Sequence, residues 1–95
     1  MSDGIPTLLF FTTPTSGPAR RMESLLAHLA RKERGRLRVT RVDCDTQPKL
    51  RAALEIREIP TLVLLVDGTD VARIEGRASA PEIERLLAPH LAHAA

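Results

Sequence analysis

The order of apolar and polar positions along the first half of the chain predicts four elements. A continuous apolar run over Thr7–Thr12 predicts a strand that is buried on both faces. Apolar residues at helical spacing predict a helix from about Pro18 to Arg34. Residues 37–44 alternate more clearly and predict a half-buried strand near a sheet edge, and residues 48–54 predict a short helix that Pro48 opens.

The second half contains the strongest apolar run, Leu62–Val66, which predicts another buried strand. The Asp67-Gly68 pair indicates a tight turn, so the strand predicted over Val71–Glu75 forms an antiparallel hairpin with it. Ser79–Glu82 is a capping box that begins the last helix, and Pro89 is expected to kink or end that helix.

These elements follow the order β-α-β-α-β-β-α, which is typical of the α/β class. The first two strands are expected to be parallel, because a helix connects them by a right-handed crossover. The hairpin adds two further strands. The sequence therefore predicts one domain over residues 1–95, with a four-stranded mixed sheet and helices on both faces.

The amino-acid composition excludes several classes of function. The chain has 43% hydrophobic and 27% charged residues and a net charge of +2, as an ordinary globular domain does. Its only aromatic residues are two phenylalanines, so the stacking surface that single-stranded nucleic acids need is missing and no nucleic-acid partner is expected. No apolar run approaches the ~20 residues of a membrane helix, and the first residues do not resemble a signal peptide. We therefore expect a cytoplasmic protein without a membrane partner.

Residues 12–19 lie between the first strand and the first helix, where reactive groups often sit in open α/β folds. Unpaired backbone N–H groups and the helix dipole would lower the pKa of a cysteine placed there. This segment contains no cysteine. The single cysteine of the chain, Cys44, comes at the end of the second predicted strand.

Several segments, taken in order, resemble the thioredoxin family over nearly the whole chain. Residues 8–11 match the strand before the active site, and Ser16-Gly17-Pro18-Ala19 falls on the family's Cys-Gly-Pro-Cys. Residues 42–45 with Gln47-Pro48 match the second strand and helix start, and residues 56–61 match the segment with the cis-proline. Asp67-Gly68 matches the hairpin turn, and Gly76 matches the glycine of the substrate groove.

The resemblance implies a thioredoxin-like fold that lacks the family's additional N-terminal strand and helix, and a connection with redox homeostasis. It also implies a cis bond between Ile59 and Pro60. A groove for a peptide or substrate is then expected at Thr15, Ser16, Gly17, Pro18, Ile59, Pro60 and Gly76.

The departures from the family are concentrated at the reactive positions. Ser16 and Ala19 replace the two cysteines, Phe10 replaces the buried acid, and Thr12 and Thr15 stand where the family has tryptophans. Thiol–disulfide exchange needs an attacking thiolate and a second thiol to resolve the mixed disulfide. Dithiol chemistry at this site is therefore excluded for this sequence. Substitution of cysteines in an active thioredoxin would explain Ser16 and Ala19, but not the other three positions, which favour a natural loss. A single changed cysteine, for example an original cysteine at Ala19, is the alternative.

Each candidate residue has an ordinary explanation and a functional one. Ser16 is expected to cap the helix, although its hydroxyl could also hold a thiolate, as in some glutathione transferases of this fold. Arg20 and Arg21 are expected to be solvated, with the alternative that they attract an anion such as a carboxylate. Cys44 is expected to pack in the core between two aspartates that raise its pKa. The alternative for Cys44 is a redox-active thiol.

Two hypotheses follow, with a weaker third. The first is a redox-inactive binding module that uses the groove near Pro60 for a protein segment or a small thiol such as glutathione. The second is a thiol–disulfide or glutathione-dependent oxidoreductase or transferase that acts through Ser16 or Cys44. The third is a subunit or homodimer that uses the fold structurally. No cofactor is expected, and no metal site, because the three histidines have no paired ligands.

Overall fold

The computed structural model describes residues 4–91 and contains the seven elements in the predicted order. The strands are β1 (Thr7–Thr12), β2 (Arg38–Asp43), β3 (Thr61–Val66) and β4 (Thr69–Glu75), and the helices are α1 (Gly17–Lys32), α2 (Pro48–Ala53) and α3 (Ala80–Leu91). Within the described range, β1 is the first element, and no helix there is long and apolar enough to cross a membrane.

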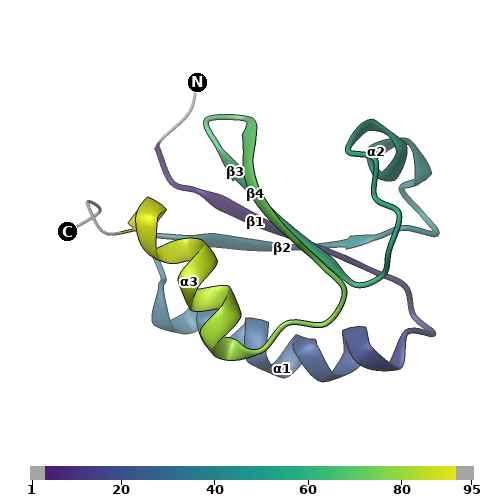
Figure 1. Cartoon of the computed structure of the whole chain (residues 1–95), viewed down its shortest axis with the longest axis horizontal. Coiled ribbons are helices and arrows are strands. Elements are labelled where there is room, and N and C mark those ends of the chain that lie inside the picture. Colours follow the sequence, from purple (N-terminus) through teal and green to yellow (C-terminus); the bar gives the residue numbers. More distant parts are fainter. Residues whose placement is uncertain (1–3, 92–95) are drawn as a thin grey trace.

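The four strands form one mixed sheet in the order β2-β1-β3-β4 (Figure 1). Strand β1 is parallel to β2 and antiparallel to β3, and β3 is antiparallel to β4. The two most apolar strands are thus the central ones, while the alternating strand β2 is an edge, as the sequence predicts. This arrangement confirms the predicted fold class.

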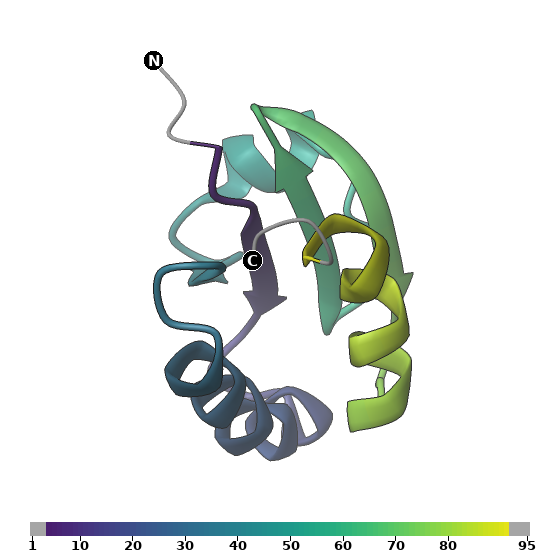
Figure 2. The same ribbon diagram turned by 90° about the vertical axis from the view of Figure 1, so that its left-hand side faces the viewer.

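Two hydrophobic cores lie on opposite faces of the sheet. Helices α1 and α3 cover one face and α2 covers the other (Figure 2). We call these the α1/α3 core and the α2 core. The buried residues of the α1/α3 core are Leu8, Phe10, Ala19, Met22, Leu26, Leu29, Leu37, Leu62, Leu64, Ile83, Leu87 and Leu91. Those of the α2 core are Leu9, Phe11, Val42, Cys44, Ile56 and Val63.

The hairpin is tighter than the sequence suggests. Asp67 and Gly68 both have positive φ, at 51° and 80°, as a two-residue turn matched to the strand twist requires. Strand β4 consequently begins at Thr69 rather than at the predicted Val71. Leu64 pairs with Ala72 and Leu65 with Asp70, so Val71 is the additional residue of a β-bulge.

Helix α3 differs from the prediction at its end, because it continues through Pro89 to Leu91. A proline this close to the end removes one backbone hydrogen bond at most from the last turns. Leu91 is buried, and its carbonyl accepts a hydrogen bond of 3.3 Å from the Arg36 guanidinium. These tertiary contacts hold the last turn in place. The predicted capping box is present, with Glu82 accepting from the backbone N–H of Ser79 at 3.2 Å.

Candidate functional site

The beginning of α1 is organised by Ser16. This residue is extended (φ −78°, ψ 112°), and its Oγ accepts a hydrogen bond of 3.1 Å from the Ala19 backbone N–H. Its carbonyl accepts from the Arg20 N–H at 3.1 Å, which starts the helical ladder. Ser16 is therefore the predicted N-cap. The hydroxyl proton of Ser16 is not used by this bond, so the side chain keeps the capacity to donate to a bound anion.

The two positions that correspond to the family's cysteines lie in different surroundings. Ser16 is half-buried, and its neighbours Thr15 and Gly17 are exposed. Ala19 is completely buried and belongs to the α1/α3 core. The first position thus meets solvent, whereas a larger side chain at the second position would have to displace core atoms. Pro18, in the first turn between them, is half-buried.

Two of the other altered positions, Phe10 and Thr12, are buried and carry groups that do not ionise. Phe10 is 2% exposed and packs in the α1/α3 core. Thr12 is also buried, and its Oγ1 donates a hydrogen bond of 3.3 Å to the carbonyl of Thr13. No side chain at these two positions can accept or release a proton near neutral pH.

The loop that leads into β3 contains two of the other residues predicted for the groove, Ile59 and Pro60. The Ile59–Pro60 peptide bond is cis, and the Gly76 N–H donates a hydrogen bond of 2.8 Å to the Pro60 carbonyl. Pro60 is fully buried and Ile59 half-buried. Within residues 4–91, the Ile59 backbone N–H and C=O make no hydrogen bond.

Glu58 is a residue of this loop that sequence reasoning missed. Gly76 has a φ of +85°, and a Cβ placed on it would contact the Glu58 carboxylate. The glycine therefore allows both the left-handed backbone and the close approach of this side chain. An exposed glutamate in a loop gives no signal in the sequence, because only the folded chain brings it next to Gly76.

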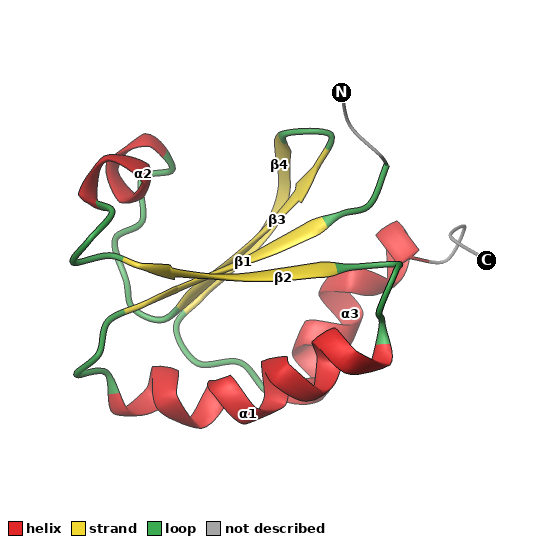
Figure 3. Cartoon of the chain, turned by 180° about the vertical axis from the view of Figure 1, so that it is seen from behind, coloured by secondary structure: helices red, strands yellow, loops and turns green. Residues whose placement is uncertain are grey.

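The β1–α1 loop, the amino end of α1 and the loop into β3 gather at one end of the sheet (Figures 1 and 3). Arg20 and Arg21 are exposed near the start of α1, whose first turn contains no acidic residue. Neither arginine forms an ion pair with any other described residue. The helix start is therefore electropositive and open to solvent.

Cys44 follows β2 at the same end of the sheet, where its backbone N–H donates a hydrogen bond of 2.9 Å to the Thr12 carbonyl. Its side chain belongs to the α2 core, on the opposite face of the sheet from Ala19. It is 4% exposed, and burial raises the pKa of its thiol. The Arg51 guanidinium acts in the opposite direction, while Asp43 and Asp45 raise the pKa further, as the sequence predicts. A buried thiol with a raised pKa is a poor nucleophile.

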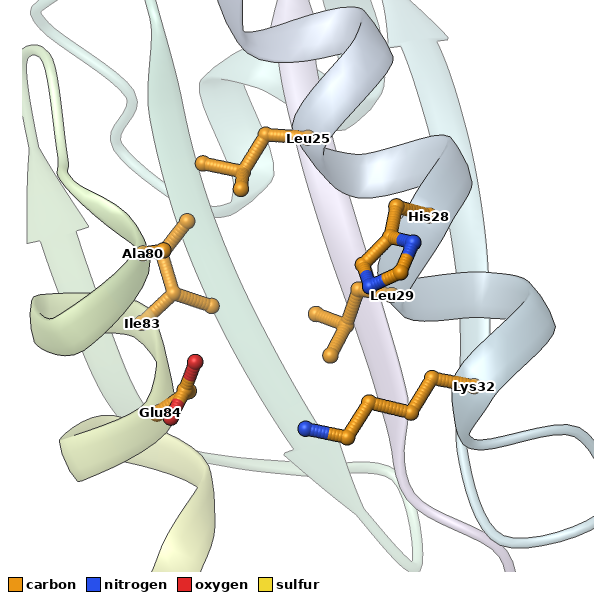
Figure 4. A pocket seen from close by; sticks show the side chains of 7 residues that line it. All are labelled: Leu25, His28, Leu29, Lys32, Ala80, Ile83 and Glu84. Atoms are coloured by element: carbon orange, nitrogen blue, oxygen red, sulfur yellow. The ribbon is translucent and has the colours of Figure 1, made fainter.

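An apolar cavity of about 190 Å³ opens between α1 and α3 (Figure 4). Leu25, Leu29 and Ile83 line it, and the side chains of Lys32 and Glu84 approach one another across it. None of the predicted groove residues lines this cavity. In the described part of the chain, no three His, Cys, Asp or Glu residues are grouped closely enough to hold a metal ion.

The sequence of this chain is similar to known proteins over most of its length. The Thioredoxin family model matches residues 2–89. Thioredoxin 1 of Nostoc sp. is 28% identical over 91 residues, which are 96% of this chain and 85% of that protein. Thioredoxin C-3 of Corynebacterium nephridii is 34% identical over 83 residues, which are 87% of this chain and 57% of that protein.

Solved structures agree as well. A mutant thioredoxin from Halobacterium salinarum superposes with a TM-score of 0.86 at 29% identity, over 95% of this chain and 78% of that one. The germline-specific thioredoxin Deadhead of Drosophila gives 0.85 at 29% identity, over 92% of this chain and 82% of that one. Because the family model matches most of the chain, this protein belongs to the thioredoxin family.

Proposed function

We propose that this thioredoxin-family protein is a redox-inactive binding module that uses the groove beside Pro60. The observation that carries the proposal is the separation of the single thiol from the family's reactive site. Cys44 belongs to the α2 core, whereas the helix start at Ser16 and Ala19 adjoins the other core. Disulfide exchange by two thiols requires both of them within reach of one substrate, and this helix start carries neither.

The backbone features of the groove support binding without reaction. The Ile59 N–H and C=O are available to an extended peptide, which would pair with them by strand addition. The bond between Gly76 and Pro60 fixes the loop that presents them. Arg20, Arg21 and the hydroxyl of Ser16 provide positive charge and a donor for a carboxylate, so glutathione is a second ligand class for the same groove. The cytoplasm is the compartment we propose for this function, because a lone cysteine stays reduced there.

The catalytic part of the proposal is tested by insulin reduction with dithiothreitol as electron source. We expect no acceleration by the natural chain. The double variant Ser16→Cys with Ala19→Cys restores two thiols one helical turn apart and should gain turnover. Turnover by the natural chain that disappears in Cys44→Ala or in Ser16→Ala would overturn the proposal in favour of an enzyme acting through that residue.

The binding part is tested with an array of linear peptides and with glutathione, using Pro60→Ala as the disrupting variant. Pro60 is buried and its carbonyl accepts from Gly76, so the change is expected to disturb the loop beside Ile59. Pro48→Ala is the matched control, because Pro48 is exposed at the start of α2. Ligands that lose affinity in Pro60→Ala but not in Pro48→Ala support the groove. Equal affinity in all three proteins would contradict it.

A further inference from the structure

The cavity between α1 and α3 has apolar walls and shares no residue with the groove beside Pro60. Leu25 and Leu29 of α1 and Ala80 and Ile83 of α3 form these walls, and the leucine and isoleucine side chains point into the space between the helices (Figure 4). The volume of about 190 Å³ exceeds the ~150 Å³ of an apolar cavity that can hold a benzene molecule. The space is therefore large enough for one six-membered ring.

Two opposite charges face one another at the mouth of this cavity. The Lys32 ammonium extends from α1 towards the Glu84 carboxylate on α3, and both side chains are exposed (Figure 4). Within residues 4–91, neither group forms an ion pair or a side-chain hydrogen bond. The two charges are thus close enough to act on one ligand, but a gap separates them.

A group that binds in this gap has to satisfy both charges. An ammonium can only donate hydrogen bonds and a carboxylate can only accept them, whereas a hydroxyl does both. A ligand carboxylate would be repelled by Glu84, and a ligand ammonium would be repelled by Lys32. The mouth of the cavity therefore favours an uncharged ligand that carries a hydroxyl group, and hydrogen bonds to charged partners are the stronger kind.

The apolar walls determine what this hydroxyl is attached to. A water molecule could bridge the two charges, but it would leave the side chains of Leu25 and Ile83 without contacts. An aromatic ring makes these contacts and, because it is rigid, loses little conformational freedom on binding. The sequence contains no tyrosine, so a second copy of this chain cannot supply a phenolic group.

We propose that the cavity between α1 and α3 binds a small uncharged phenol. The ring lies between the two helices, against Leu25, Leu29 and Ile83. The hydroxyl lies at the mouth, where it donates a hydrogen bond to the Glu84 carboxylate and accepts one from the Lys32 ammonium. This site does not depend on the groove beside Pro60, and the two can be tested separately.

The test uses phenol as the probe and follows the leucine and isoleucine methyl groups of the full chain by NMR. We expect ring-current shifts at the methyl groups of Leu25, Leu29 and Ile83. Benzene lacks the hydroxyl and anisole lacks its proton, so each should bind roughly tenfold more weakly than phenol. Benzoate and benzylamine, which carry a charge, should also bind more weakly.

The same titrations contain the results that would overturn the proposal. Equal affinity for phenol and benzene would show an apolar cavity without a hydroxyl site. Tighter binding of benzoate or benzylamine would show that only one of the two charges acts on the ligand. Shifts at the Ile59 methyl groups in place of those at Ile83 would assign phenol to the groove beside Pro60, and the absence of any shift would exclude the site.

Three variants address the mouth and the walls of the cavity. Lys32→Ala and Glu84→Ala each remove one partner of the hydroxyl, so each should weaken phenol about tenfold and leave the affinity for benzene unchanged. Ala80→Leu extends a wall residue into the cavity and should abolish the binding of both molecules. Arg31→Ala is the matched control and should change nothing, because Arg31 is an exposed cation of α1 that does not line the cavity.

The variants also have outcomes that contradict the proposal. Unchanged phenol affinity in both Lys32→Ala and Glu84→Ala would overturn it. A loss of affinity in His28→Ala alone would overturn it as well, because the hydroxyl would then bind the third polar side chain of the cavity. Thermal unfolding establishes that each variant is folded, and the two exposed positions at the mouth decide the proposal even if Ala80→Leu does not fold.

Discussion

The start of α1 and the residue that follows β2 differ in opposite ways from the surroundings and the residue type that a reactive thiol needs. The helix start has what lowers a thiol pKa, namely the positive end of the helix dipole and exposed cations, but it carries Ser16 instead of a cysteine. The cysteine directly follows β2, where burial raises the pKa of the Cys44 thiol and the neighbouring aspartates raise it further. The reactivity of a cysteine thiol therefore depends on its surroundings in the fold, and the residue type alone does not provide it.

The largest effect is expected from moving the thiol between these two places. A cysteine introduced by Ser16→Cys in a Cys44→Ala background should react with a disulfide reagent at neutral pH about 100-fold faster than Cys44 in the natural chain. The helix start favours the thiolate, whereas burial disfavours it and blocks access. Stopped-flow absorbance measures both rates. Similar rates would show that Cys44 is not protected by the α2 core.

The converse comparison concerns what Cys44 contributes to stability. Cys44→Ser places a hydroxyl in an apolar core and should lower the free energy of unfolding by about 2 kcal/mol. Cys44→Ala leaves only a small cavity and should cost about 1 kcal/mol. Urea denaturation gives both values. If serine were tolerated better than alanine, the site would be polar and the assignment of Cys44 to the core would be wrong.

Much of the fold could be predicted from the sequence because its signals are local. The runs that became β1 and β3 and the capping residue Ser79 depend on neighbours within a few positions. The continuation of α3 through Pro89 could not be predicted in this way, since it depends on Arg36 binding the Leu91 carbonyl across the fold.

The candidate site also has features that follow from local sequence and features that depend on contacts across the fold. The role of Ser16 as N-cap follows from its place before a helix, and the structure confirms it. The contact of Glu58 with Gly76 joins residues on two loops, and the cavity between α1 and α3 depends on how these two helices pack. Neither feature can be predicted from the local pattern of apolar and polar residues in the sequence. The choice of groove ligand remains a prediction.

A smaller effect separates the capping role of Ser16 from a role in binding. Ser16→Ala removes the acceptor for the Ala19 N–H and should lower the free energy of unfolding by about 1 kcal/mol. Ser16→Asp supplies another capping oxygen and should retain most of that stability. Its negative charge would also repel a carboxylate ligand from the groove. Thermal unfolding together with a glutathione titration distinguishes the two roles. Loss of stability in both variants would contradict simple capping.

The smallest effect compares the two capped helix starts as pH falls. Hydrogen bonds from the backbone and hydroxyl of Ser79 lower the pKa of the Glu82 carboxyl, whereas no acidic residue lies in the first turn of α1. A carboxyl whose pKa is lower in the folded state contributes stability that is fully present above its unfolded pKa and is lost as pH falls through the folded value. Glu82→Gln should therefore flatten the acid limb of the stability profile slightly, while Ser16→Ala should shift the whole profile down without changing its shape. Urea titrations at successive pH values measure both. A change in the shape of the stability profile of Ser16→Ala would reveal an ionisable group coupled to the start of α1. The start of α1 would then not consist only of groups that do not titrate, contrary to the comparison made here between the two helix starts.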